Sequence, residues 1–125
     1  MASESLHESA KQLRPETIDR HRAVSSLMEE LEAVDWYDQR IDAATDEELK
    51  AVLRHNRDEE KEHAAMVLEW LRRHDPVLDQ QLRTYLFKDG DIMAAEAEAE
   101  GGAEPADVGD GSLGIGDLRK DEAAP

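Results

Sequence analysis

Two long segments of the chain repeat apolar residues at steps of three and four, the spacing that places side chains on one face of an α-helix. The first segment starts at Pro15, which suits the first turn of a helix because proline has no N–H to leave unpaired. Its apolar stripe consists of Ile18, Val24, Leu27, Leu31, Val34 and Ile41. The stripe of the second segment consists of Leu49, Val52, Leu53, Val67, Trp70 and Leu71. Both segments are therefore predicted to be amphipathic helices.

The boundaries of the helices follow from their flanking residues. Thr45-Asp46-Glu47-Glu48 matches a capping box, with Thr45 as the N-cap and Glu48 reaching back to it. The second helix is expected to end before Asp75-Pro76, and a third, shorter helix to cover 76–88 with Gly90 as its stop. Two long helices joined by a short turn predict an antiparallel hairpin. Such a hairpin cannot bury its broad apolar side alone, so we expect it to dimerise into a four-helix bundle.

The predicted fold class is all-α, with a disordered C-terminal tail. The expected parts are a polar arm over 1–14, the hairpin domain over 15–90, an acidic flexible linker over 91–111, an aliphatic segment over 112–120 and a terminal tail over 121–125. Inside the linker, alternating Ala and Glu over 94–100 favour a weak helix. Three aliphatic residues in 112–120 serve no core there, which is typical of a docking peptide.

The charge and composition narrow the possible partners. The net charge is −16, from 31 acidic and 15 basic side chains, which argues against nucleic acid or an anionic membrane and is compatible with handling cations. The sequence contains 0 cysteines, which excludes thiol chemistry, Fe–S clusters and disulfides. No run approaches the roughly 20 apolar residues of a membrane span, and the first residues lack the apolar stretch of a signal peptide. We therefore expect a cytoplasmic protein.

Polar residues interrupt both stripes at positions that face each other. Glu60 and His63 fall in the middle of the second stripe with i, i+3 spacing, so their side chains converge. Glu30 lies on the flank of the first stripe, and Tyr37 follows two turns later, where it is expected to pack and offer a phenol. A carboxylate removed from water costs several kcal/mol unless it is paired. Carboxylate and imidazole without thiolate suit iron, manganese or zinc, so the pattern predicts a metal site.

The number of these ligands points to a dimer. A ferritin-like di-iron bundle takes a Glu from each of two helices and a Glu-x-x-His from each of two others. This chain supplies half of that set, and a two-fold dimer would complete it while covering both apolar faces. The alternative is structural: Glu60 pairs with Arg20 or Arg57, and His63 is an ordinary core histidine.

Two further acidic groups have two interpretations each. Glu29 and Glu32, with Trp36, lie on the other side of the first helix, where they either gather cations or form a solvated face. One flank of the second helix carries His55, Glu59 and Glu62. That flank is either a surface metal site or ordinary solvated surface.

Two motif blocks carry a resemblance to a known family. The blocks are MEELEAVDWYDQR over 28–40 and HNRDEEKEHAAM over 55–66, and together they resemble encapsulated ferritin from about residue 17 through 87. The resemblance implies that Glu30, Glu60 and His63 bind two irons per dimer across the interface, with Tyr37 beside them. It also implies that Glu29 and Glu32 form an accessory site for iron, calcium or another divalent cation.

The same resemblance implies a ring-shaped decamer that works inside an encapsulin nanocompartment. The stretch from Leu113 to Arg119 is similar to the peptide that docks such cargo on the shell protein, although Asp117 and the residues after Lys120 depart from its common form. The function expected from the residues and the resemblance is a ferroxidase that supplies Fe(III) for mineral storage. The alternatives are a non-catalytic helical adaptor or cargo protein, and a di-iron protein with peroxide or oxygenase chemistry.

Overall fold

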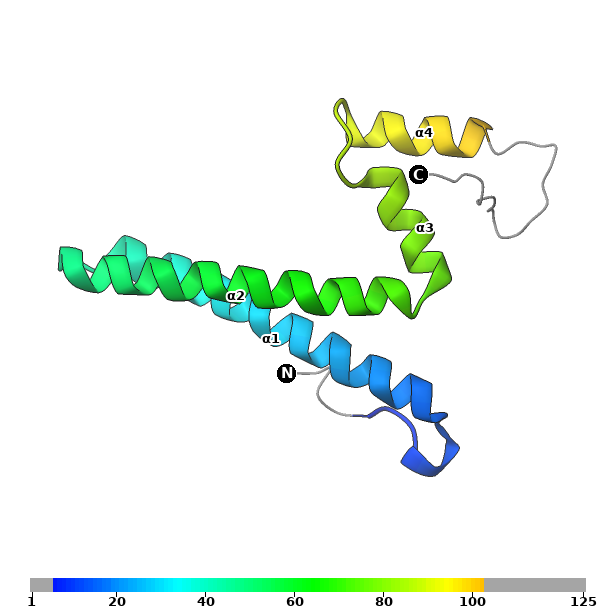
Figure 1. The fold of residues 1–125 in the computed structure, drawn as a ribbon, viewed down its shortest axis with the longest axis horizontal. Helices are drawn as coiled ribbons and strands as arrows, with labels where there is room; N and C mark the ends of the chain where they lie inside the picture. Colours follow the sequence, from blue (N-terminus) through cyan, green and yellow to red (C-terminus); the bar gives the residue numbers. More distant parts are fainter. Residues whose placement is uncertain (1–5, 103–125) are drawn as a thin grey trace. The chain divides into compact units, whose positions relative to one another are not determined.

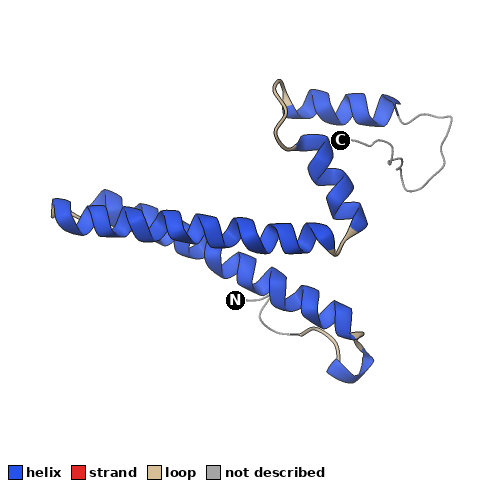
Figure 2. Cartoon of the chain, in the orientation of Figure 1, coloured by secondary structure: helices blue, strands red, loops and turns tan. Residues whose placement is uncertain are grey.

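The computed structural model describes residues 6–102, and every regular element in that range is helical (Figures 1 and 2). The elements are η2 over Ala10–Gln12, α1 over Pro15–Ala43, α2 over Glu47–Arg73, α3 over Pro76–Tyr85 and α4 over Ile92–Gly102. The all-α class is confirmed for this part of the chain. The chain divides into two compact units, the first ending at His74 and the second beginning at Asp75. Each unit is described by itself.

Helix α1 starts where the sequence predicts. Pro15 occupies its first position, and the carbonyl of Arg14 accepts hydrogen bonds from the backbone N–H groups of Thr17 at 3.0 Å and Ile18 at 3.1 Å. The helix ends at Ala43 after 29 residues. A three-residue connection then leads into α2, which is short enough to make the two helices antiparallel neighbours. Figure 1 shows α1 and α2 side by side.

The N-cap of α2 differs from the prediction by one residue. Asp46, and not Thr45, is the N-cap, and its carboxylate accepts a hydrogen bond from the backbone N–H of Leu49 at 2.8 Å. The capping-box prediction was therefore wrong in assigning Thr45 and Glu48. A carboxylate at this place interacts with the helix dipole as well as with the N–H, an advantage that a threonine hydroxyl lacks.

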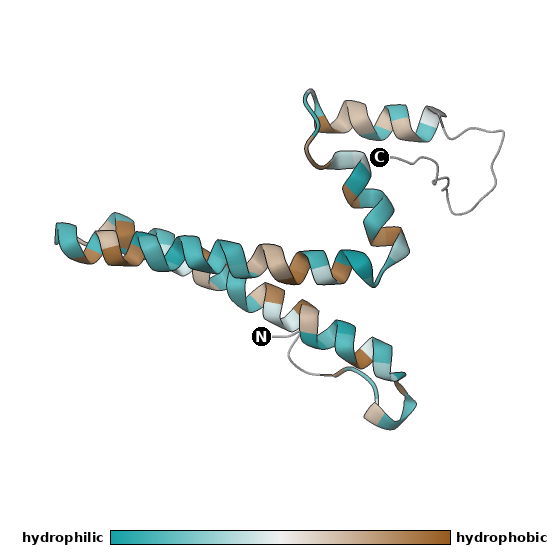
Figure 3. Ribbon diagram, viewed as in Figure 1, coloured by the Kyte–Doolittle hydropathy of each residue, from teal (hydrophilic) through white to brown (hydrophobic). Residues whose placement is uncertain are grey.

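The hairpin has a thin core. Among residues 6–102, only Ile41, Ala64 and Leu71 are less than a tenth exposed. Several members of the predicted stripes stay open in the single chain, including Leu31 at 53% and Val52 at 51% exposure. Figure 3 shows hydrophobic segments along both long helices. The observed hairpin thus leaves large apolar side chains uncovered, as the sequence predicts for a chain of this design.

The second unit begins with α3, which is capped by the carboxylate of Asp75. The predicted extent of 76–88 was too long, because the helix ends at Tyr85. Leu86, the C-cap, has extended backbone angles of φ −80° and ψ 145°, which end the helix before Gly90 is reached. Phe87 follows with a left-handed backbone, φ 60°. Gly90 itself has φ 94° and belongs to the turn that follows.

Helix α4 covers the weak helix expected over 94–100 and starts two residues earlier, at Ile92. Asp91 caps it by accepting a hydrogen bond from the backbone N–H of Ala94 at 2.9 Å. None of the helices within 6–102 combines the length and apolarity needed to cross a bilayer. The predicted docking segment, 112–120, and the terminal tail, 121–125, lie outside the described residues.

Candidate metal centre

Three polar side chains meet between the two long helices. Glu30 comes from the middle of α1, and Glu60 and His63 come from one turn of α2. One ligand atom of each lies within 4.8 Å of the other two. In the described part of the chain this is the only group of three or more converging Asp, Glu and His side chains. The structure therefore brings together, within one protomer, the three residues that the sequence places on facing stripes.

The imidazole of His63 turns one nitrogen toward both carboxylates. Its Nδ1 lies 3.2 Å from Oε1 of Glu60 and 3.6 Å from Oε1 of Glu30. The side chains of Glu30 and Glu60 are 25% and 26% exposed, and that of His63 is 41% exposed. The group is thus half-buried between α1 and α2, and each of its side chains keeps part of its surface accessible to solvent.

The protonation of the group follows from these contacts. A hydrogen bond between the two carboxyl groups raises the pKa of Glu30 and lowers that of Glu60, so Glu30 is the side that keeps the proton. The hydrogen bond to Glu60, with the negative charge of Glu30, raises the pKa of His63. The contacts therefore favour the protonated forms of Glu30 and His63 more than in the free side chains, and a metal ion would compete with protons for these atoms.

The possible metal ligands of the group are oxygen and nitrogen atoms, without sulfur. They comprise four carboxylate oxygens and an imidazole nitrogen, a set that suits Fe(II), Mn(II) or Zn(II) and not the soft ions that prefer sulfur. Three side chains fill only part of the coordination sphere of one such ion. A pair of ions needs additional donors from outside the protomer.

The structural alternative for Glu60 does not match the contacts. Arg57 donates hydrogen bonds to Asp38 at 3.0 Å and to Asp58 at 3.1 Å, so its guanidinium is directed at other carboxylates. Arg20 lines a surface hollow that also includes Trp70. Glu60 instead contacts His63, which at 41% exposure is not a buried core histidine.

Tyr37 does not touch the group within one protomer. It lies two turns after Glu30 on α1, and its ring is covered by the guanidinium of Arg40, with Cζ at 5.4 Å from the ring centroid. In residues 6–102 no hydrogen bond joins Tyr37 to the three ligands. A role for its phenol beside the metal remains a prediction.

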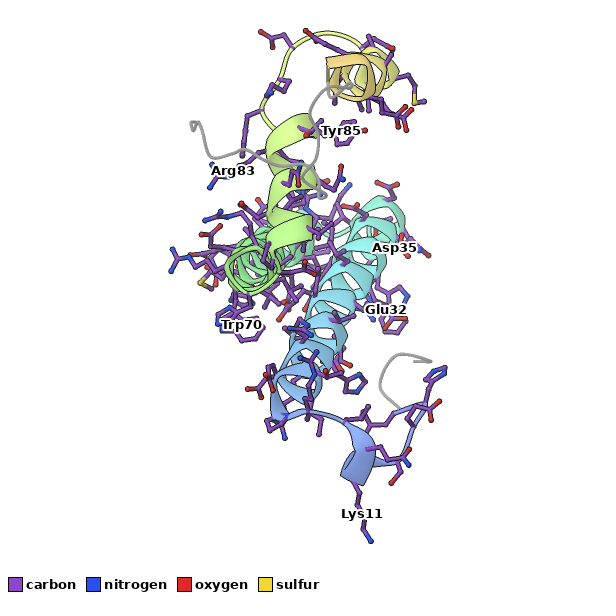
Figure 4. The ribbon with its side chains drawn as sticks, turned by 90° about the vertical axis from the view of Figure 1, so that its right-hand side faces the viewer. Lys11, Glu32, Asp35, Trp70, Arg83 and Tyr85 are labelled. Carbon is purple, nitrogen blue, oxygen red and sulfur yellow. The ribbon has the colours of Figure 1, made fainter. Side chains whose placement is uncertain are left out.

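The accessory acidic residues are separate from this centre. Glu32 lies on the side of α1 that is turned away from α2 (Figure 4). Neither Glu29 nor Glu32 joins a convergent group of three within the described protomer. Trp36, on the same helix, is 49% exposed. An accessory cation site there remains a prediction.

The flank of α2 predicted as a surface site is partly assembled. Nε2 of His55 lies 3.7 Å from Oε2 of Glu59, and the other oxygen of Glu59 lies 4.0 Å from Nε2 of His63. Glu59 therefore stands between an exposed histidine and the histidine of the central group. Glu62 does not enter a convergent group of three among the described residues.

Two features near the centre were not predicted. The first is the cross-helix ion pair between Arg57 and Asp38, for which the sequence signal was a basic residue beside one stripe and an acidic one beside the other. The second is an open groove of about 360 Å³ next to the ligands, with mostly apolar walls. Its lining residues are Arg22, Ala23, Ser26, Met66, Val67 and Trp70.

Comparison with known proteins assigns the chain to a family. The family described as EncFtn-like matches residues 5–89. An "Encapsulated ferritin-like protein" of Rhodospirillum rubrum is 62% identical over 131 residues, covering 98% of this chain and 93% of the relative. An "Encapsulin nanocompartment cargo protein EncC" of Myxococcus xanthus is 38% identical, covering 73% of this chain and 77% of the relative.

A solved structure agrees with the fold. The crystal structure of a protein from Nitrosomonas europaea is 59% identical and superposes with a TM-score of 0.69, covering 70% of this chain and 97% of that one. The motif blocks that carried the resemblance lie inside the matched region. The chain belongs to the EncFtn-like family of encapsulated ferritin-like proteins.

Proposed function

We propose that this protein is a ferroxidase that oxidises Fe(II) with O₂ at a di-iron centre shared by two copies of the chain. The observation that carries the proposal is the convergence of Glu30, Glu60 and His63 at one half-buried place. Leucine at these positions would bury apolar surface, so three ionisable side chains there are costly unless they bind a cation.

The dimer follows from the ligand count and from the surface around the ligands. One protomer supplies one Glu and one Glu-x-x-His, half of the ferritin-like set. The groove beside the ligands is walled by Met66, Val67 and Trp70, and Met66 is 57% exposed. A second copy related by a two-fold axis would cover this apolar wall and add its own three ligands in the same step.

Iron is the substrate of the proposed reaction. Each Fe(II) gives one electron, so two ions held close together would reduce one O₂ by two electrons. With two protons from solvent, the products are two Fe(III) and hydrogen peroxide, and no superoxide is released. The protein's part is to fix the geometry of the carboxylates and imidazole and to leave coordination positions open for O₂. Metal binding requires an ionised carboxylate and a neutral imidazole, so it should release any proton that His63 or Glu30 holds. The acidic chain, at net charge −16, raises the local concentration of Fe(II).

Delivery of the oxidised iron rests on the tail and on the relatives. One relative carries the name of an encapsulin nanocompartment cargo protein. The segment 112–120 is the proposed docking peptide, and many tails on one ring-shaped assembly would bind the shell with avidity. We therefore place the protein inside an encapsulin compartment, whose lumen would store the mineral.

Mixing anaerobic Fe(II) with the protein in air, while following ferric absorbance, tests the oxidase proposal. Wild type should oxidise iron faster than buffer, and Glu60→Ala should lose most of that rate because one ligand is missing. Glu48→Ala is the matched control, since it removes the same charge from the exposed first turn of α2. A wild type no faster than buffer, or a Glu60→Ala variant as fast as wild type, would leave the adaptor interpretation as the better one.

A further inference from the structure

An ion pair between Arg57 and Asp38 joins the two long helices. Arg57 of α2 donates from Nη1 to Oδ1 of Asp38 on α1 at 3.0 Å, and from Nε to Oδ1 of Asp58 at 3.1 Å. Its side chain is only 23% exposed. The two hydrogen bonds raise the pKa of the guanidinium above its ordinary value, that to Asp38 contributing most. A planar guanidinium held by two carboxylates has little freedom to move.

Other arginines of the hairpin make local pairs. Arg22 contacts Asp19, and Arg73 contacts Glu69, each on its own helix at a separation of three or four residues. Such pairs within one helix add little to the stability of that helix, and they do not connect it to another helix. The Arg57 pair spans 19 residues of sequence and ties α1 to α2. It is therefore suited to fix one helix against the other.

The position of this pair relative to the metal ligands is informative. Asp38 lies about 12 Å beyond Glu30 along α1, and Arg57 lies one turn before Glu60 on α2, at about 1.5 Å of rise per residue. A slip of one residue would move Glu30 by that rise, whereas metal ligands tolerate only about 0.2 Å.

The apolar contacts are poor at preventing such a slip. The buried residues of the interface are Ile41 at one end, and Ala64 and Leu71 on the other side of the ligands. Ala64, the one nearest to His63 in sequence, is too small to interlock with the facing helix. The polar pair therefore supplies a constraint on register that the thin core does not.

We propose that Arg57 is a positioning residue for the metal centre, because its bond to Asp38 fixes the register that brings Glu30 to Glu60 and His63. The inference rests on the proposed metal-binding function. The charge of Arg57 distinguishes this role from a direct electrostatic effect on the metal. A positive charge near a cation site disfavours the cation, so any benefit from Arg57 must come from geometry and not from its charge.

The charge of Arg57 and its positioning role have opposite expected effects on cation binding, so an experiment can separate them. Co(II) is titrated into the full-length protein and followed by its visible absorption, which responds to the ligand set and does not need oxidation. Arg57→Gln and the matched control Arg73→Gln each remove one positive charge, so charge alone predicts equal or tighter binding for both. The positioning role predicts that Arg57→Gln weakens Co(II) binding by about tenfold or more and alters its spectrum, while Arg73→Gln does neither.

A second pair of variants covers the case in which Arg57→Gln folds poorly. Asp38→Asn should weaken Co(II) binding more than Asp19→Asn, which removes the same charge from a local pair on α1. In the Asp38→Asn background, Arg57→Gln should cause no further loss, because the pair is already broken. Circular dichroism confirms that each variant is helical before titration.

The outcomes separate this inference from the proposed function. If Glu60→Ala binds Co(II) with the affinity and spectrum of wild type, the metal centre itself is wrong, and both ideas are overturned. If Glu60→Ala loses binding but Arg57→Gln matches Arg73→Gln, the centre stands and the positioning role is overturned. Losses that simply add in the double variant would also overturn it, since they would not arise from the bond between the two side chains.

Discussion

Replacing the three ligands with apolar side chains separates a metal centre from a structural polar network. The variant carries Glu30→Met, Glu60→Met and His63→Leu, substitutions that keep side-chain size and good helix propensity. If the role of the three side chains is to bind metal, they should lower the free energy of unfolding of the metal-free protein. Removing them should then stabilise the metal-free fold.

The magnitude follows from their burial. The three side chains are 25%, 26% and 41% exposed, so most of each is covered by the hairpin even before a second chain is added. Full burial of a Met or Leu contributes about 1.5–3 kcal/mol, and partial burial and a compact unfolded state reduce this. Replacements of buried ionic triads by apolar residues have stabilised proteins by about 1–4 kcal/mol, and we expect a gain in the same range.

Thermal unfolding in a chelator, at one fixed protein concentration, measures the gain. A change of 1 kcal/mol moves the midpoint by about 4–8 °C for a domain of this size. Co(II) at about 1,000 times its Kd should cancel or reverse the difference in stability, because it adds about 4.1 kcal/mol to wild type and nothing to the variant. The matched control changes exposed residues of the same types on α2: Glu48→Met, Glu62→Met and His55→Leu. It should not raise the midpoint.

The reasoning fails if the triple variant melts below wild type in the chelator. That result would mean that Glu30, Glu60 and His63 stabilise the fold through the hydrogen bonds that they make to one another, without a metal. A midpoint that rises equally in the triple variant and in the exposed control would also refute it, since burial would then have no part in the gain.

Three further predictions concern protons, the helix cap and the tail. The raised pKa of His63, caused first by Glu60, means that Co(II) affinity should keep rising to a higher pH than for an ordinary histidine, which is half protonated at about pH 6.5; titrations between about pH 6 and about pH 8 in which the affinity levels off where a free histidine would have lost its proton would contradict this. Metal-free protein should lose the stability that this proton provides over the same rise in pH, which chemical denaturation in a chelator would measure. Asp46→Ala should lower the unfolding free energy by about 1 kcal/mol, whereas Thr45→Ala should change it by less than about 0.5 kcal/mol; the reverse order would restore the capping box. Deleting 112–125 should abolish co-purification with an encapsulin shell protein and leave iron oxidation intact, and retained loading would exclude this segment as the docking peptide.

The helices and the ligand group could be predicted because both depend on local spacing. Pro15 and the stripe after it determine where α1 begins, and the i, i+3 step brings Glu60 and His63 together on any helix. The cap of α2 was harder, because Thr45 and Asp46 are both good N-cap residues at adjacent positions. The end of α3 was missed because the chain turns extended at Leu86 and left-handed at Phe87, conformations that these side-chain types do not signal.

The ion pair between Arg57 and Asp38 was beyond local reasoning for another reason. Nineteen residues separate the two side chains, and whether they meet depends on the crossing and register of the helices. Periodicity gives the direction of a stripe but not the axial alignment of two stripes. From the sequence, Arg57 was therefore a possible partner of Glu60, which lies one turn after it on the same helix. In the structure Arg57 contacts Asp38 on the other helix instead.

The stripes and the burial of the single hairpin disagree in an informative way. Leu31 belongs to the predicted stripe of α1 but is 53% exposed, whereas Glu30, on the flank of that stripe, has a side chain that is only 25% exposed. The hydrophobic stripe of a helix includes the residues that pack in the full oligomer as well as those that pack within one protomer. A single protomer shows only the contacts between its own two long helices. The uncovered members of the stripes therefore predict where further copies of the chain pack. Two of the exposed apolar residues, Leu31 and Met66, lie within one turn of Glu30 and His63 along their helices, so we expect packing of a second copy and metal binding to depend on the same contact.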